Sequence, residues 1–154
     1  MNEPTAIKRG TELELDIQSL AYGGMGVAKA DNFVIFVKNA IPGQRVFARV
    51  YKKRKGYAEA SVKEVLRESK HAKRVRCNHY YICSKLQSLS YDKQINEKAN
   101  QVEDNFRRLG GFSKFSLDDK IVAKQVFNYR NKMEFTFSPH RWVLETEPEG
   151  VDRS

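Results

Sequence analysis

The sequence has few cysteines, few prolines and no long apolar run. Its 154 residues include two cysteines and four prolines, and two cysteines are too few for a disulfide framework. No apolar stretch approaches the roughly 20 residues that span a bilayer. The first ten residues, MNEPTAIKRG, lack the apolar segment of a secretory signal. We therefore expect a cytoplasmic protein with no membrane partner.

Positive charge is abundant and concentrated in one part of the chain. The formal net charge is +9, and residues 44–76 contain twelve Lys or Arg and three acids, so this stretch carries the whole excess. Its densest part is KKRK at 52–55, between Tyr51 and Tyr57. Cations that meet phosphates, interleaved with rings that stack on unpaired bases, indicate RNA binding. The alternative is a solvated turn that only keeps the protein soluble.

Residues 1–67 are predicted to form a small β-barrel. Leu13, Leu15 and Ile17 alternate with polar neighbours, which is typical of a half-buried strand. The apolar run at 33–37 has the size of a strand buried on both sides. Five short strands separated by turn signals predict a barrel of the OB type, with residues 52–55 on a hairpin tip. The clearest strands are expected at about 13–17, 33–37, 46–51 and 57–66, with the glycine-rich stretch 21–29 after the first.

A helix is predicted at about 90–109, where six residues recur at steps of three and four. Ser90 is a candidate N-cap and Gly110-Gly111 a candidate stop. The opposite face, which includes Glu97, is charged. Strands are predicted at about 120–127 and 129–138, so that residues 90–154 form a partial α+β domain and the fold class is mainly β with α. The recurring residues of the helix are Tyr91, Ile95, Lys98, Val102, Phe106 and Leu109.

The segment RCNHYYICSKLQ, at 76–87, holds both cysteines with His79 between them. It could be an incomplete metal site or two packed thiols. Structural zinc takes four ligands and a cubane iron–sulfur cluster takes four thiolates. Cys77, His79 and Cys83 together fall short of either set, so we expect reduced thiols that pack as small apolar groups.

Several stretches together resemble one known family. LELDIQSLAYGGMGVAK at 13–29 and VIFVKNAIPGQRVFARVYKKRKGYAEA at 34–60 look like the TRAM domain, an OB-like barrel that binds RNA. RCNHYYIC, KLQSLSYDKQINEK and FNYRNKMEFTF, at 76–83, 85–98 and 127–137, look like the next part of the RNA (uracil-5-)-methyltransferases. The resemblance covers nearly the whole chain, in order and with matching spacing.

The resemblance implies an RNA interface and a degenerate cysteine loop at 68–89. Many family members bind a 4Fe–4S cluster through C-x5-C-G-G-C followed by x-x-Q. Cys77, Cys83 and Gln87 match that pattern, but the third cysteine is missing and the fourth would fall past Ser154. Cys77 and Cys83 are therefore candidate ligands of a degenerate site, and no cofactor is expected in this chain. The candidate RNA-binding residues are Arg49, Lys52, Lys53, Arg54, Lys55, Tyr57, Tyr129, Arg130, Asn131 and Lys132.

Methylation of uracil C5 requires a nucleophilic cysteine, a general base and a methyl donor. In the family these parts, including the S-adenosylmethionine site, lie C-terminal to the segments matched here, so no catalytic residue is assigned and the isolated chain is not expected to be active. We expect the N-terminal part of a truncated methyltransferase that acts on a uridine in ribosomal RNA. The alternatives are a standalone TRAM-type RNA-binding module and, less favoured, an unrelated basic protein of the ribosome.

Overall fold

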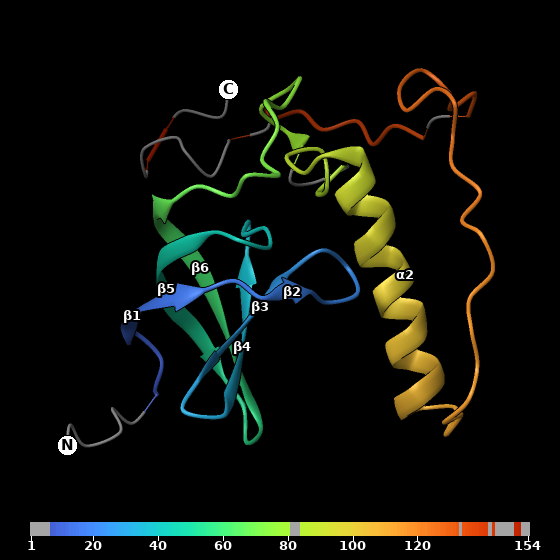
Figure 1. Cartoon of the computed structure of the whole chain (residues 1–154). Helices are drawn as coiled ribbons and strands as arrows, with labels where there is room; N and C mark the ends of the chain where they lie inside the picture. Colours follow the sequence, from blue (N-terminus) through green and yellow to red (C-terminus); the bar gives the residue numbers. More distant parts are fainter. Residues whose placement is uncertain (1–6, 81–83, 133, 142, 144–149, 152–154) are drawn as a thin grey trace.

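The computed structural model describes residues 7–80, 84–132, 134–141, 143 and 150–151. A β-barrel forms the N-terminal part, and one long helix lies beside it (Figure 1). Six strands belong to one sheet with the order β1-β5-β6-β4-β3-β2. The elements are β1 (Glu12–Asp16), β2 (Ser19–Leu20), β3 (Gly26–Ala30), β4 (Phe33–Lys38), β5 (Arg45–Lys53), β6 (Tyr57–Arg67) and α2 (Tyr91–Arg108).

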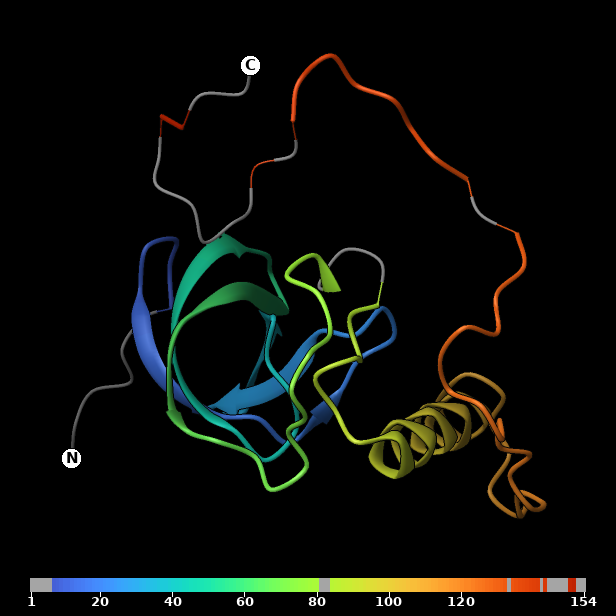
Figure 2. The same ribbon diagram turned by 90° about the horizontal axis from the view of Figure 1, so that it is seen from above.

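The sheet closes because β1 and β2 are one stretch of chain that changes partners. β1 pairs with β5, whereas β2 pairs with β3 at the opposite end of the strand order. The change takes place between two adjacent residues: the Ile17 amide donates to the Gln44 carbonyl at 2.9 Å, and the Gln18 amide donates to the Val27 carbonyl at 2.8 Å. Seen from above, the strands curve around a common axis (Figure 2).

With β1 and β2 counted as one, five strands make the barrel, as the sequence predicts. Counted in this way, β3, β4, β5 and β6 are the second to fifth strands. Around the barrel the strands follow the order first, second, third, fifth and fourth, and the third and fifth strands (β4 and β6) are parallel. This is the arrangement of an OB-type barrel. The interior is filled by alternating small and branched side chains, among them Ile35, Val46, Val50 and Ala58, all essentially inaccessible to solvent. The structure thus confirms the predicted fold class, mainly β with α, and the predicted alternation of buried and exposed residues along the strands.

A second, smaller apolar cluster joins the barrel to the chain that follows β6. Leu20 and Ile41 from the barrel pack against Leu89, which is fully buried. Leu89 is held by an isolated antiparallel bridge to Ala72. The segment between β6 and α2 is therefore folded back on the barrel and delivers the start of the helix to its side.

The helix α2 docks on the barrel through polar side chains. Glu97 is 2% exposed; one carboxylate oxygen accepts the Leu20 amide at 3.0 Å and the other accepts Lys93 Nζ at 2.7 Å. One turn further on, Gln101 Nε2 donates to the Leu20 carbonyl at 3.1 Å. Since Leu20 is the last residue of the short strand β2, these side chains satisfy backbone groups that a neighbouring strand would otherwise bind.

The predicted helix lies where expected, but the apolar stripe is not its most buried side. Glu97, which belongs to the charged face opposite that stripe, is the most buried residue of α2. In contrast, Val102 and Phe106 are 43% and 45% exposed, and Leu109 is 84% exposed. Periodicity finds an apolar stripe but does not say whether the described residues cover it. Ser90 occupies the N-cap position without a side-chain capping bond.

The strands predicted at about 120–127 and 129–138 are not formed in the described part of those ranges. The chain instead returns along α2: Lys120 Nζ donates to Asn96 Oδ1 at 2.8 Å, and the Ala123 amide donates to Tyr91 Oη at 2.9 Å. Ile121 and Phe137 are almost completely exposed. A strand requires a neighbouring strand to bind its backbone groups, and no described segment lies alongside as one. Met133 is outside the described residues.

Gly26 provides a test of barrel closure. A Cβ atom there would lie 2.9 Å from Ile17 Cγ2 and 3.0 Å from Ala40 Cβ, where β1 passes into β2. We expect Gly26→Ala to lower the free energy of unfolding by about 1–3 kcal/mol, the usual cost of overpacking a core, measured by urea denaturation. Gly56→Ala is the matched control, since nothing lies within 4 Å of its Cβ; equal losses in both variants would contradict the closure described.

Glu97 provides a separate test of helix docking. We expect Glu97→Ala to speed amide hydrogen exchange throughout α2 while β4–β6 stay protected, because the buried Leu20 amide loses its acceptor at a cost of about 1–3 kcal/mol. Asp104→Ala is the control, because its ion pair with Arg108 is exposed and long at 3.8 Å. Unchanged exchange in α2 of the Glu97 variant would show that other contacts hold the helix.

Candidate nucleic-acid interface

The basic cluster at 52–55 lies at the tip of the β5–β6 hairpin, as predicted. The Arg54 amide donates to the Tyr57 carbonyl at 2.8 Å and closes the turn. Two of the four cations are held against the barrel: Lys52 Nζ lies 2.6 Å from Glu59 Oε1, and Lys53 Nζ lies 4.0 Å from the centre of the Phe33 ring. Arg54 and Lys55 are exposed, and their charges point into solvent at the end of the hairpin.

Next to the hairpin, the outer surface of β3, β4 and β6 carries aromatic rings bordered by lysines. Phe36 and Tyr57 meet edge to face, with ring centres 5.4 Å apart. Lys29 opposes Val34 at one side of this surface, and Lys38 is exposed at the end of β4. The run at 33–37 is therefore buried on one side only; the prediction of burial on both sides was wrong, because its second side forms this half-exposed surface.

Glu59 lies within this surface and is tied down by two neighbours. Its Oε1 accepts Lys52 Nζ and its Oε2 accepts Tyr51 Oη at 3.1 Å. The hydrogen bond from Lys52 holds the pKa of the Glu59 carboxyl below its ordinary value, with a smaller contribution from Tyr51. One acid of the interface is thus neutralised by one lysine. Lys29, Arg54 and Lys55 form no ion pair with a described residue and give the surface positive charge, and Lys38 adds a further lysine at its edge.

Arg49, the remaining predicted RNA-binding residue of the barrel, lies on a different wall. The outer surface of β1, β5 and the end of β6 carries three ion pairs: Arg45 with Glu14 at 2.7 Å, Arg49 with Glu12 at 3.9 Å and Arg67 with Asp16 at 3.1 Å. These pairs balance the charge on that wall. Three of the twelve cations of residues 44–76 are therefore paired with acids on that wall, whereas Arg54 and Lys55 at the hairpin tip form no ion pair with a described residue.

The turn between β2 and β3 adds an exposed ring that the sequence did not single out. Tyr22 is 92% exposed, and Gly23 and Gly24 follow it with φ of +87° and +83°, a backbone conformation that favours glycine. In OB-type barrels, oligonucleotides bind across the second and third strands and the loops that follow the first and fourth. Here those elements are β3, β4, the Tyr22 turn and the β5–β6 hairpin.

Comparison with known proteins finds a domain family that matches most of the barrel. The family model of the TRAM domain matches residues 7–63. Residues 7–63 form a TRAM domain. Over 140 residues the chain is 34% identical to an uncharacterized RNA methyltransferase of Porphyromonas gingivalis, and over 130 residues it is 37% identical to one of Bacteroides thetaiotaomicron. These findings confirm the resemblance to RNA methyltransferases found in the sequence.

The matches differ in how much of each protein they cover. They span 90% and 83% of this chain but 30% and 29% of the two relatives, so the chain spans about a third of the length of the curated proteins it matches. A solution structure of a conserved protein from Methanococcus maripaludis is 34% identical and covers 40% of this chain and 86% of its own, with a TM-score of 0.36.

Downstream of the TRAM domain, the four residues at 129–132 are not gathered onto the barrel surface. Tyr129 is 75% exposed, Arg130 Nε donates to the Lys132 carbonyl at 2.8 Å, and Lys132 Nζ lies 3.3 Å from Glu134. Asn131 is exposed between them. The described contacts of this group are local, so the structure does not join it to the hairpin tip, and its role in RNA binding stays a prediction.

The described part of the cysteine loop is held by contacts within the protein. Cys77 is a free, exposed thiol, and Cys83 lies outside the described residues. Gln87, which matches the glutamine of the cluster pattern, accepts the Arg76 amide through Oε1, and the Arg76 guanidinium stacks 3.7 Å from the Phe127 ring. No group of three metal-ligating side chains occurs among the described residues. With two cysteines in the sequence, this chain cannot by itself supply the four thiolates of a cubane cluster.

The described residues also do not fit a methyl-donor site of the Rossmann type. Such a site needs a glycine-rich turn that leads from a parallel strand into a helix. In this chain the parallel strands β4 and β6 are followed by β5 and by the segment that begins at Glu68, and α2 starts at Tyr91 after the Leu89 bridge.

No helix in the described part of the chain is long and apolar enough to cross a membrane.

The lowered pKa of Glu59 leads to a pH-dependent prediction. A depressed carboxyl pKa contributes stability that is complete above the unfolded-state pKa and is lost as pH falls through the folded-state pKa. We therefore expect the difference in unfolding free energy between the wild type and Glu59→Gln to shrink as the pH falls. In Lys52→Ala, we expect the pKa of Glu59, measured by NMR titration, to rise toward its ordinary value. A Glu59 pKa unaffected by removal of Lys52 would contradict the ion pair described.

Proposed function

We propose that the TRAM domain binds single-stranded RNA across β3, β4 and the β5–β6 hairpin. The observation that carries the proposal is the Phe36–Tyr57 pair, bordered by Lys29, Lys38 and the free cations of the hairpin tip, on the side of the barrel that OB folds use. Rings of this kind stack on unpaired bases, and lysines and arginines contact the phosphates between them. The names of the relatives support RNA as the ligand.

We further propose that the chain works as the RNA-binding part of an RNA (uracil-5-)-methyltransferase that modifies a uridine in ribosomal RNA in the cytoplasm. S-adenosylmethionine would supply the methyl group in such an enzyme. The residues of this chain would hold and orient the RNA strand. Support comes from the residue stretches that resemble this family and from the relatives' names.

The alternative is a TRAM module that acts alone. Exposed apolar side chains on α2 and beyond favour the larger enzyme: Val102 and Phe106 on the helix, and Ile121, Phe135 and Phe137 after it, are 43–101% exposed. Apolar patches of this kind generally mark contacts with other protein surfaces. A module acting alone would leave them in water.

RNA binding is tested by removing the two unpaired cations of the hairpin tip. We expect Arg54→Ala/Lys55→Ala to weaken binding to single-stranded RNA of any sequence and to reduce the slope of log K against log salt by about 1.4, since each phosphate contact on a single strand contributes about 0.7. Fluorescence anisotropy at several salt concentrations measures both quantities.

The matched control removes the same charge elsewhere. Arg45→Ala/Arg67→Ala takes two arginines from the wall where both are paired with acids, and we expect its salt slope to equal that of the wild type. If both double variants bind alike, net charge alone attracts the RNA and the proposed surface is wrong.

A further inference from the structure

We infer that the groove between the Tyr22 turn and helix α2 binds a nucleotide of the same RNA strand, so that the RNA path continues from the barrel onto the helix. This inference rests on the proposed RNA binding and adds a second contact site to it. The groove has a volume of about 470 Å³ and is lined on the barrel side by Tyr22, Gly23 and Gly24, and on the helix side by Lys98, Gln101 and Asn105. Pockets that hold small ligands are generally about 300–1,000 Å³.

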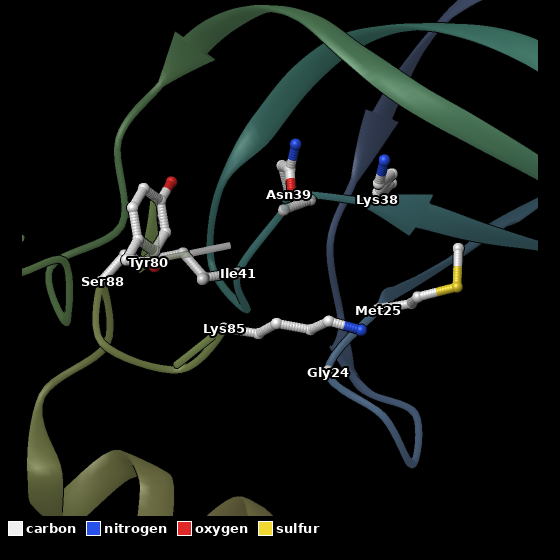
Figure 3. Close-up of a pocket in the computed structure, with 9 residues that line it drawn as sticks. Gly24, Met25, Lys38, Asn39, Ile41, Tyr80, Lys85 and Ser88 are labelled. Atoms are coloured by element: carbon white, nitrogen blue, oxygen red, sulfur yellow. The ribbon is translucent and has the colours of Figure 1, made fainter. Parts of the chain in front are cut away.

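The groove adjoins a smaller hollow beside the end of β4. That hollow, of about 40 Å³, is lined by Lys38 at the end of β4 and by Lys85 from the segment before α2, and Figure 3 shows Lys85 reaching toward the glycine turn. Gly24 and Lys85 line both hollows. An RNA strand that leaves the Phe36–Tyr57 surface beside Lys38 next meets Lys85 and then Lys98. The described residues that line the two hollows include no acidic side chain.

The chemistry of the groove suits a nucleotide. Tyr22 presents a ring that is 92% exposed and free to stack on a base. Lys85 and Lys98 offer two charges for phosphates, and Leu86 and Val102 are apolar residues of the same lining. The Asn105 amide and the Oε1 atom of Gln101 are also part of the lining, and amide groups bind base edges in single strands.

The walls of the groove are held in place by interactions already described. Gln101 Nε2 donates to the Leu20 and Ala21 carbonyls, at 3.1 and 3.4 Å, immediately before Tyr22. Lys85 Nζ donates to the Gly23 carbonyl at 3.2 Å. A Cβ on Gly24 would lie 3.3 Å from Lys85 Cβ, a tight contact, and the φ of +83° at Gly24 favours glycine where the turn approaches the segment before α2. The groove is thus formed before any ligand arrives.

The test compares oligonucleotides of different length. With fluorescein-labelled oligouridylate of 16 nucleotides, we expect Tyr22→Ala to weaken binding about tenfold, as loss of one stacked base does, and Tyr22→Phe to bind like the wild type. Lys98→Ala should lower the salt slope by about 0.7. With a 4-nucleotide oligomer, which covers fewer of the contact sites at once, we expect both variants to lose less affinity than they do with the 16-mer.

Controls separate this inference from the proposed function. Lys124→Ala removes an exposed lysine outside the groove and should leave both oligomers unaffected. If the hairpin-tip variant loses affinity while Tyr22→Ala and Lys98→Ala bind the 16-mer like the wild type, the groove is not a nucleotide site and barrel binding stands. If the wild type binds neither oligomer, the proposed function and this inference both fail.

Discussion

The structure depends on the change of strand partner at Ile17 and Gln18. Ile17 is bound to the start of β5 and Gln18 to β3, so two successive residues join opposite ends of the strand order. Because the sheet closes in this way, the side chains of Ile35, Val46 and Ala58 pack in one core. The closure also turns the other side of β4 outward and places the Tyr22 turn and the β5–β6 hairpin at either end of that outer surface. The absence of a side chain at Gly26 is what lets the strands cross there.

Closure also determines how the rest of the chain is attached. β2 is only two residues long, and its last residue, Leu20, presents backbone groups that are bound by α2 rather than by another strand. The buried carboxylate of Glu97 is tolerated because a backbone amide and Lys93 both bind it. Docking by polar groups leaves the apolar side of α2 exposed and forms a groove beside the Tyr22 turn. The barrel therefore sets the position of the helix, and the helix forms the second wall of the groove.

The barrel could be predicted from the sequence because its determinants are local. Alternation in β1, β5 and β6, and turn residues between them, suffice to place the basic cluster on a hairpin tip. The helix at 91–108 could be predicted for the same reason. The predictions that were wrong concerned features that depend on which segments of the chain contact one another. A charged residue such as Glu97 is expected at the surface, and the sequence does not show that its carboxylate binds the Leu20 amide. Residues 120–127 have the pattern of a strand, but no described strand lies beside them.

The candidate site was predicted only in part, for a related reason. Lys52 to Lys55 form a dense cluster that composition reveals, but the pairing of Lys52 with Glu59 and of Arg49 with Glu12 depends on which strands are neighbours. Tyr22 carries no signal in the sequence, because a single tyrosine in a glycine-rich turn has no period and no charge around it. Its importance follows from its exposure and from the loop it occupies.

The central claim is that RNA lies on the outer surface of β3, β4 and the β5–β6 hairpin. The most direct measurement is an NMR titration of the isotope-labelled chain with an unstructured RNA octamer, recording backbone amide shifts. The account predicts that shifts concentrate on Lys29, Phe36, Lys38 and residues 53–57, while the wall of ion pairs at Glu12, Glu14 and Arg45 stays unchanged. Shifts that concentrate on that wall, or none at saturating RNA, would contradict it.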